Sequence, residues 1–267
     1  MVTSKTDGIV VKKPRFALVD AVRGLAIIGV VIYHIVWDLR YFRFTSTDPV
    51  FDMLWLAFAK VLVASFLILA GMSLVLAHHE KTHWGAFWKR FGILAGAALV
   101  VSIGTYVAFS DGFVYFGILH ALAVFSLIGV FFVRAPIWIV VALAVIFLGG
   151  MFVYQSDAFN VKYLTWIGFW TVEPYTQDLV PMFPGLGFVF SGIVLMRVIL
   201  AWDAGMQALS WQVQGWWFDG LVKAGRWSLL IYLIHQPILF AIIMPLANWL
   251  EPGKMSVEEQ AQIFKGN

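Results

Sequence analysis

The sequence predicts an all-α fold, a polytopic membrane helical bundle with about seven transmembrane helices. Apolar residues make up 61% of the 267 positions and charged residues only 12%, whereas a soluble domain carries about 25% charged residues. Long uncharged runs recur along the chain, and about 20 apolar residues are enough for one helix to cross the hydrocarbon core. These runs are apolar on both faces, which excludes the alternating polarity of a membrane β-barrel.

Seven runs have the length of a membrane span. The first follows Lys12, Lys13 and Arg15, and no small-residue cleavage site comes after it, so we expect this helix to be retained. A weaker patch between the fifth and sixth runs, residues 163–172, is too short to cross and is expected to lie in the interface or to re-enter, with an eighth span left open. The seven runs are Phe16–Trp37, Met53–Ala77, Phe87–Phe109, Phe113–Val133, Pro136–Tyr154, Met182–Leu200 and Trp227–Leu250.

One membrane domain is expected to occupy residues 15–250. Residues 1–14 are polar and are expected to be a flexible cytoplasmic N-terminus, and residues 251–267 are expected to be a polar C-terminal tail. The chain has no cysteine, which excludes disulfides, thiolate nucleophiles and cysteine metal sites.

The distribution of basic residues predicts the orientation of the bundle. A cytoplasmic N-terminus places eleven Lys and Arg residues on the inner side and five on the outer side, as the positive-inside rule requires. The basic residues form no dense patch with interleaved aromatics, so the net charge of +3 does not indicate nucleic acid as a partner. The outer five are Arg40, Arg43, Lys162, Lys254 and Lys265.

Polar residues inside the predicted spans are the functional candidates, because charges at membrane depth are costly and usually face the bundle interior. Counting from the helix ends, we expect an inner group of Asp20 and Arg23 on the first span with His235 and Gln236 on the last. Asp20 and Arg23 are three residues apart. This spacing allows either a self-neutralising ion pair or a phosphate-binding site, and both remain open.

A second, outer group is expected near the other surface. His34 lies 14 residues beyond Asp20, which is about 21 Å along a helix axis, and His120 near the start of the fourth span is expected at the same level. Asp38 is four residues after His34, so the carboxylate could orient the imidazole. A histidine held in this way can act as a general base, although a plain interfacial histidine has the same spacing.

The loop after the second span, His78 to His83, contains three histidines and a glutamate. Imidazole and carboxylate both bind zinc. The segment is polar and lacks the helix-borne order of known zinc motifs, so we interpret it as a solvated loop and predict no metal.

The chain resembles the heparan-alpha-glucosaminide N-acetyltransferase-like family of transmembrane acyltransferases, as a bacterial-type member. The resemblance covers roughly residues 15–245. It rests on the Asp–Arg–Gly opening of the first span and on four further patches in the same order. The opening is at 19–27, and the four patches are 66–73 with Gly71, 116–120, 178–184 leading to Gly192, and 232–237.

The resemblance implies a reaction in which an acyl group, typically acetyl, moves from cytoplasmic acetyl-CoA to an amine or hydroxyl of a sugar across the membrane. Arg23, with Lys and Arg residues at the inner ends of other helices, would then meet the phosphates of CoA, and Asp20, His235 and Gln236 would belong to the same donor site. His34, with Asp38, and His120 would flank the transfer point, and Asp178 in the outer loop would orient a histidine or contact sugar hydroxyls.

The sequence departs from the animal members of this family. These have, in our alignment, an asparagine at the position of His34 and a histidine in the next loop, where this chain reads Phe44-Thr45-Ser46. His34 as the base is therefore inferred for a bacterial-type member, expected in the cytoplasmic membrane. A surface glycan or lipid-linked sugar is a more plausible acceptor than heparan, although nothing in the sequence selects one, and a homodimer is left open.

Two other classes of function fit the intramembrane polar residues. A transporter or channel would line a proton or solute path with them, and would show flux without acetyl-CoA. A structural membrane subunit would use them only for helix packing, and would tolerate loss of His34 and His120.

Overall fold

The computed structural model describes residues 16–47, 52–211 and 213–250. Within these ranges every regular element is helical, which confirms the predicted all-α membrane bundle. The terminal segments predicted as a flexible N-terminus and a polar tail, 1–14 and 251–267, lie outside the described residues.

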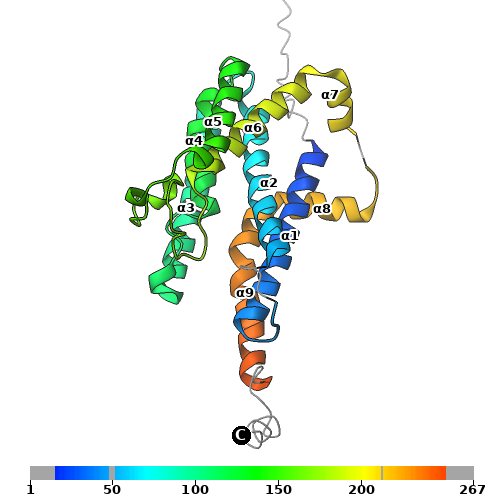
Figure 1. Ribbon diagram of the computed structural model, residues 1–267. Helices are drawn as coiled ribbons and strands as arrows, with labels where there is room; N and C mark the ends of the chain where they lie inside the picture. The colour runs from blue at the N-terminus through cyan, green and yellow to red at the C-terminus, as the bar shows by residue number, and fades with distance from the viewer. Residues whose placement is uncertain (1–15, 48–51, 212, 251–267) are drawn as a thin grey trace, which may run out of the picture.

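Seven apolar helices occupy the seven predicted spans. Five of them are long and apolar enough to cross a membrane, namely α1 Ala17–Tyr41, α2 Met53–His78, α3 Trp84–Ala108, α6 Met182–Ala201 and α9 Ser228–Leu250. The other two are shorter apolar helices, α4 Ile118–Phe132 and α5 Ile137–Val153. The short helices α7 Asp203–Leu209 and α8 Trp216–Arg226 lie between α6 and α9 (Figure 1).

Two details differ from the prediction. The fourth span was expected from Phe113, but α4 begins at Ile118 because the preceding residues are extended, and Phe116 forms an isolated parallel bridge with Leu179. The apolar patch 163–172 forms an irregular loop with one 3₁₀ turn, Thr165–Ile167, so it is not an eighth transmembrane helix.

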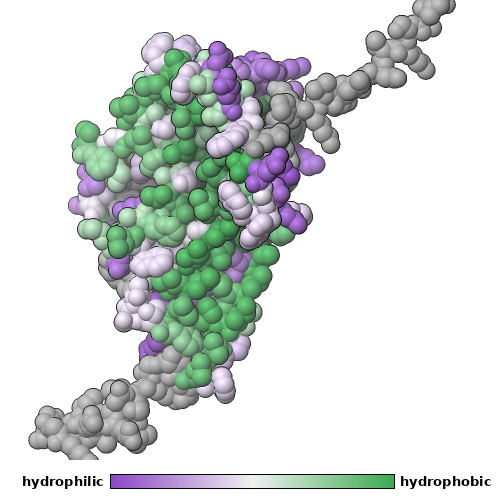
Figure 2. Space-filling view, turned by 90° about the vertical axis from the view of Figure 1, so that its right-hand side faces the viewer, coloured by the Kyte–Doolittle hydropathy of each residue, from purple (hydrophilic) through white to green (hydrophobic). Residues whose placement is uncertain are grey.

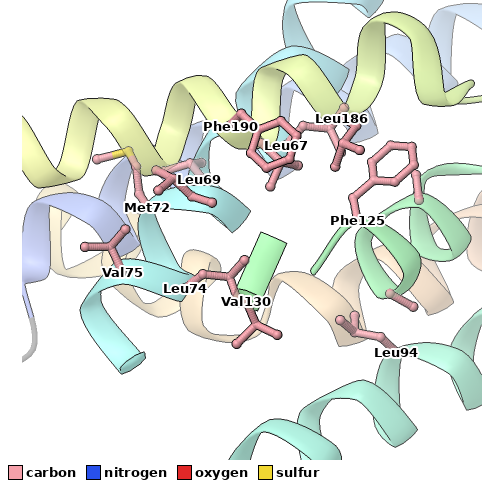
Figure 3. Close-up of a cluster of buried hydrophobic side chains, with 14 of the residues drawn as sticks. Leu67, Leu69, Met72, Leu74, Val75, Leu94, Phe125, Val130, Leu186 and Phe190 are labelled. Carbon is pink, nitrogen blue, oxygen red and sulfur yellow. The ribbon is translucent and has the colours of Figure 1, made fainter. Parts of the chain in front are cut away.

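The core lies where α2, α4, α5 and α6 meet. Figure 3 shows apolar side chains of α2, such as Leu67 and Leu69, close to Leu186 and Phe190 of α6, with Phe125 of α4 facing them. Glycines bring α2 and α6 together, because a Cβ at Gly71 would overlap the Val189 carbonyl and one at Gly192 would overlap the Ile68 carbonyl. Such close backbone approach through small residues is typical of membrane helix pairs.

Much of the outer surface is apolar. Figure 2 shows a continuous hydrophobic face along the molecule, with hydrophilic side chains gathered mainly toward its upper end. Large apolar side chains such as Leu25, Ile103 and Phe152 are exposed at 62%, 57% and 83%. A surface of this kind is suited to contact with lipid chains rather than with water.

α8 crosses α1 at close range and sets the position of α9. A Cβ at Gly225 of α8 would overlap the Asp20 carbonyl, and one at Gly24 of α1 would overlap the Leu221 carbonyl, so the two backbones touch here. Figure 1 shows α8 lying across α1 and α9 continuing alongside α1. α9 therefore starts beside the second turn of α1 rather than level with the beginning of that helix.

Candidate functional site

Four polar residues from α1 and α9 lie together inside the apolar bundle. The Gln236 side-chain amide donates a hydrogen bond to Asp38 Oδ1 over 2.7 Å. One turn away, the imidazole rings of His34 and His235 face each other with centroids 4.9 Å apart. Asp38 is fully buried and His235 is 8% exposed. We call His34, Asp38, His235 and Gln236 the polar cluster.

Each residue of the polar cluster has one buried polar atom with no hydrogen-bond partner among the described residues. These atoms are His34 Nδ1, Asp38 Oδ2, His235 Nε2 and Gln236 Oε1. A single buried polar group left without a partner costs about 1–3 kcal/mol, so four in one place are unfavourable for a site with a purely structural role. The arrangement is better suited to binding a polar group brought by a ligand.

The tautomer of His235 follows from its backbone contact. His235 Nδ1 lies 2.6 Å from the Tyr232 carbonyl oxygen, and a carbonyl oxygen only accepts, so Nδ1 carries the proton. In the neutral ring, Nε2 then holds a free lone pair, and this is the atom without a partner. His235 is therefore oriented as a proton acceptor.

The predicted pairing of His34 with Asp38 does not form. The four-residue spacing places both side chains on the same side of α1, but Asp38 Oδ1 accepts from Gln236 instead, and neither Asp38 Oδ2 nor His34 Nδ1 has a partner. Residue spacing predicts only neighbours on the same helix. The partner that Asp38 takes comes from α9, 198 positions later in the chain.

The predicted grouping by depth is wrong for His235 and Gln236. They were expected beside Asp20 and Arg23, but they contact His34 and Asp38. The reason is the start of α9. Because Gly225 touches the backbone of α1 next to Gly24, α9 begins at Ser228, just beyond this crossing. From there α9 runs alongside α1 (Figure 1), which brings His235 to the level of His34.

Asp20 and Arg23 form a second polar site on the side where α1 begins. Arg23 pairs with Asp20 over 2.8 Å and donates to the Ser73 hydroxyl of α2 over 3.0 Å. Asp20 also pairs with Arg226 at the end of α8 over 3.3 Å. The ion pair, one of the two alternatives that the three-residue spacing left open, is present. Sequence reasoning missed Ser73 and used Arg226 only as a topology marker.

Asp178 connects the loop before α6 to the start of α4 by a side-chain hydrogen bond. Its Oδ2 accepts from the Ile118 amide over 2.8 Å, and the Tyr232 hydroxyl of α9 lies 3.5 Å away. Loss of solvation raises the pKa of the Asp178 carboxyl to about 6, although these two hydrogen bonds oppose the shift. No hydrogen bond or ion pair among the described residues joins Asp178 to a histidine, so its predicted role in orienting one remains a prediction.

His120 is held at the start of α4 by bonds to both ring nitrogens. The Gly117 amide donates to Nδ1 over 3.2 Å, so the neutral ring carries its proton on Nε2, which lies 3.2 Å from the Ser102 hydroxyl. Ser102 in turn donates to the Val114 carbonyl over 2.6 Å. No hydrogen bond or ring contact between described residues joins His120 to His34. Its catalytic role stays a prediction, and the bonds are those of a positioning residue.

Within the described ranges, no group of three or more His, Cys, Asp or Glu side chains is arranged to hold a metal ion. In the histidine-rich loop, the His83 amide donates to His78 Nδ1 over 3.2 Å. This bond stabilises the turn between α2 and α3.

Comparison with protein families gives a match to a family of acetyltransferases. The family model described as heparan-alpha-glucosaminide N-acetyltransferase, catalytic, matches residues 15–237, a stretch that includes both polar sites. No curated protein and no solved structure matches the chain.

Proposed function

Since this chain belongs to the heparan-alpha-glucosaminide N-acetyltransferase catalytic family, we propose that it is a membrane-embedded enzyme that moves an acetyl group from acetyl-CoA to a sugar. The acceptor atom is an amine or hydroxyl of a sugar or glycan. The observation that carries the proposal is the polar cluster, with four unpartnered polar atoms between two helices of an apolar bundle. Family membership and the helices together make the chain an integral membrane acetyltransferase-type protein.

His34 is the proposed general base. A neutral imidazole takes the proton from the acceptor amine or hydroxyl as that atom attacks the thioester carbonyl, and returns it to the departing CoA sulfur when the carbon–sulfur bond breaks. His235 Nε2 has a free lone pair on the facing ring. It stabilises the imidazolium of His34 by accepting a hydrogen bond from it.

Asp38 and Gln236 are proposed to orient the reactants. Gln236 donates its amide hydrogen to Asp38, which leaves Gln236 Oε1 and Asp38 Oδ2 as acceptors. The pantetheine arm of CoA carries amide and hydroxyl donors, and sugar hydroxyls are donors too. We therefore still propose that His235 and Gln236 bind the donor, but that they contact the thioester end of acetyl-CoA and not its phosphates.

Arg23 and Asp20 are proposed to bind the other end of the donor. Arg23 can form charge-assisted bonds to the phosphates of CoA while Asp20 and Ser73 hold its side chain. Arg23 and His34 are eleven residues apart on α1, about 16 Å along the axis. The long, flexible pantetheine arm would extend between these two sites.

The proposed orientation has the N-terminus in the cytoplasm of a bacterial cell, as the count of basic residues favours. The Arg23 side then faces the cytoplasmic pool of acetyl-CoA. The polar cluster lies toward the opposite surface, where His120 and Asp178 would help to position a surface glycan or lipid-linked sugar.

The test is acetyl transfer by the full chain in proteoliposomes. Labelled acetyl-CoA would be offered with a panel of amino sugars and lipid-linked sugars. We expect transfer with the wild-type chain and a loss of about 10²- to 10⁴-fold in His34→Gln, the usual contribution of a general base. His79→Gln is the matched control, in the loop outside the polar cluster, and should keep full activity.

A transporter is the alternative function. It would move protons or a solute across the same liposomes without acetyl-CoA. Flux of this kind, with no acetyl transfer to any acceptor of the panel, would contradict the proposed function.

A further inference from the structure

A cavity of about 220 Å³ lies between α2, α3 and α4, apart from the polar cluster. Its walls are mostly apolar side chains such as Leu74, Phe91 and Leu94, and its polar lining residues include Arg90, His78 and His83. Leu74 of this wall directly follows Ser73 on α2, and the Ser73 hydroxyl accepts a hydrogen bond from Arg23. The cavity therefore lies beside the Arg23 site.

Arg90 of α3 has no hydrogen bond or ion pair with any residue in the described part of the chain. Its side chain is not buried, so a ligand can reach it. Arg90 also lies close enough to Arg23 for the two positive charges to repel each other. A bound anion would relieve this repulsion between the two guanidinium groups.

The charges around the Arg23 site are unbalanced. Asp20 pairs with both Arg23 and Arg226, and no carboxylate in the described part of the chain pairs with Arg90. Arg23, Arg226 and Arg90 thus carry three positive charges against the one negative charge of Asp20. A phosphate or diphosphate group carries the matching negative charge, and guanidinium binds it with two parallel hydrogen bonds.

We propose that Arg90 and Arg23 together form a phosphate-binding site at this cavity. The ligand is a phosphate-bearing molecule. Under the proposed function, on which this part of the inference rests, it is the nucleotide end of acyl-CoA, and an anionic lipid headgroup would supply the same chemistry. Arg90 is then a binding residue for the donor, on a different helix from the predicted Arg23.

The experiment compares Arg90→Gln with Lys89→Gln in the purified full chain. Lys89 is the exposed neighbour on the same helix turn and does not line the cavity, so it controls for a general loss of positive charge. Equilibrium binding of CoA and of inorganic phosphate would be measured, together with stabilisation by phosphatidylglycerol added to a neutral detergent.

We expect Arg90→Gln to weaken CoA binding about tenfold or more, the effect of one charged hydrogen-bonded contact, and Lys89→Gln to stay within about twofold. Without ligand, Arg90→Gln should melt at a higher temperature than the wild type, because the repulsion from Arg23 is removed. An arginine needed only for packing would instead lower the melting temperature.

The outcomes separate this inference from the proposed function. CoA binding that is equal in wild type and Arg90→Gln would overturn the phosphate site and leave the acetyltransferase proposal standing. A wild type that ignores CoA but is stabilised by phosphatidylglycerol through Arg90 would support the site, assign it to lipid, and count against the proposed donor. If no probe depends on Arg90, the site is overturned.

Discussion

Gln236 on α9 donates a 2.7 Å hydrogen bond to Asp38 on α1, and through it joins the first and last membrane helices. Asp38 is fully buried. Its Oδ1 accepts this bond, and its Oδ2 has no partner in the described part of the chain. The bond therefore holds α9 in register with α1 at the level of the facing histidines.

Gln236→Leu should lower the stability of the folded chain by about 1–3 kcal/mol, because it leaves the Asp38 carboxyl without its donor. Asp38→Asn should cost less, since an amide at this position can still accept from Gln236. Thermal unfolding of the two single variants measures this difference. If Gln236→Leu is no less stable than Asp38→Asn, the bond contributes nothing.

His235→Asn should fold but lose acetyl transfer. The asparagine amide can replace the Nδ1 donor to the Tyr232 carbonyl, but it offers no lone pair at the position of Nε2. We expect transfer to fall at least about 10²-fold, as for loss of a positioned proton acceptor. The readouts are melting temperature and transfer rate on the same sample, and full activity in His235→Asn would rule out the proposed role of Nε2.

Gly225→Ala should destabilise the chain and abolish activity together. The added Cβ would overlap the Asp20 carbonyl, so α8 must move away from α1 and α9 must shift with it. Gly220→Ala on the same helix is the matched control, because a Cβ there meets nothing within 4 Å. Its higher helix propensity should raise stability by up to about 1 kcal/mol. Equal melting temperatures for the two variants would contradict the crossing.

Asp178 should make stability depend on pH. Its pKa is about 6 in the folded chain against 3.8 for a free carboxyl, so the folded state holds the proton more tightly. The contribution of Asp178 to the free energy of unfolding is therefore highest below about pH 4, and it is lost as the pH rises from about 4 through about 6. Asp178→Asn should remove this pH dependence. The melting temperature of the variant relative to that of the wild type should therefore rise between pH 5 and pH 7.5. A constant difference across this range would contradict the raised pKa.

The sequence by itself determined which segments enter the membrane and which residues carry the polar chemistry. Hydropathy is a local property, because each helix must satisfy its own backbone hydrogen bonds in lipid, and all seven predicted runs contain an apolar helix. The Asp20 and Arg23 pair was predictable for the same reason, since its two members lie within one helix turn. The four residues of the polar cluster were all candidates in advance.

Only the tertiary structure decided which of these residues meet. The depth of His235 could not be counted from the start of its helix, because contact between Gly225 and α1 sets where α9 begins. The Asp38 carboxylate accepts a hydrogen bond from Gln236 and not from His34, because helix packing places the Gln236 amide of α9 within 2.7 Å of it. Arg90 shows the same limit: its neighbour Arg23 lies 67 positions earlier, and only helix packing brings the two charges together.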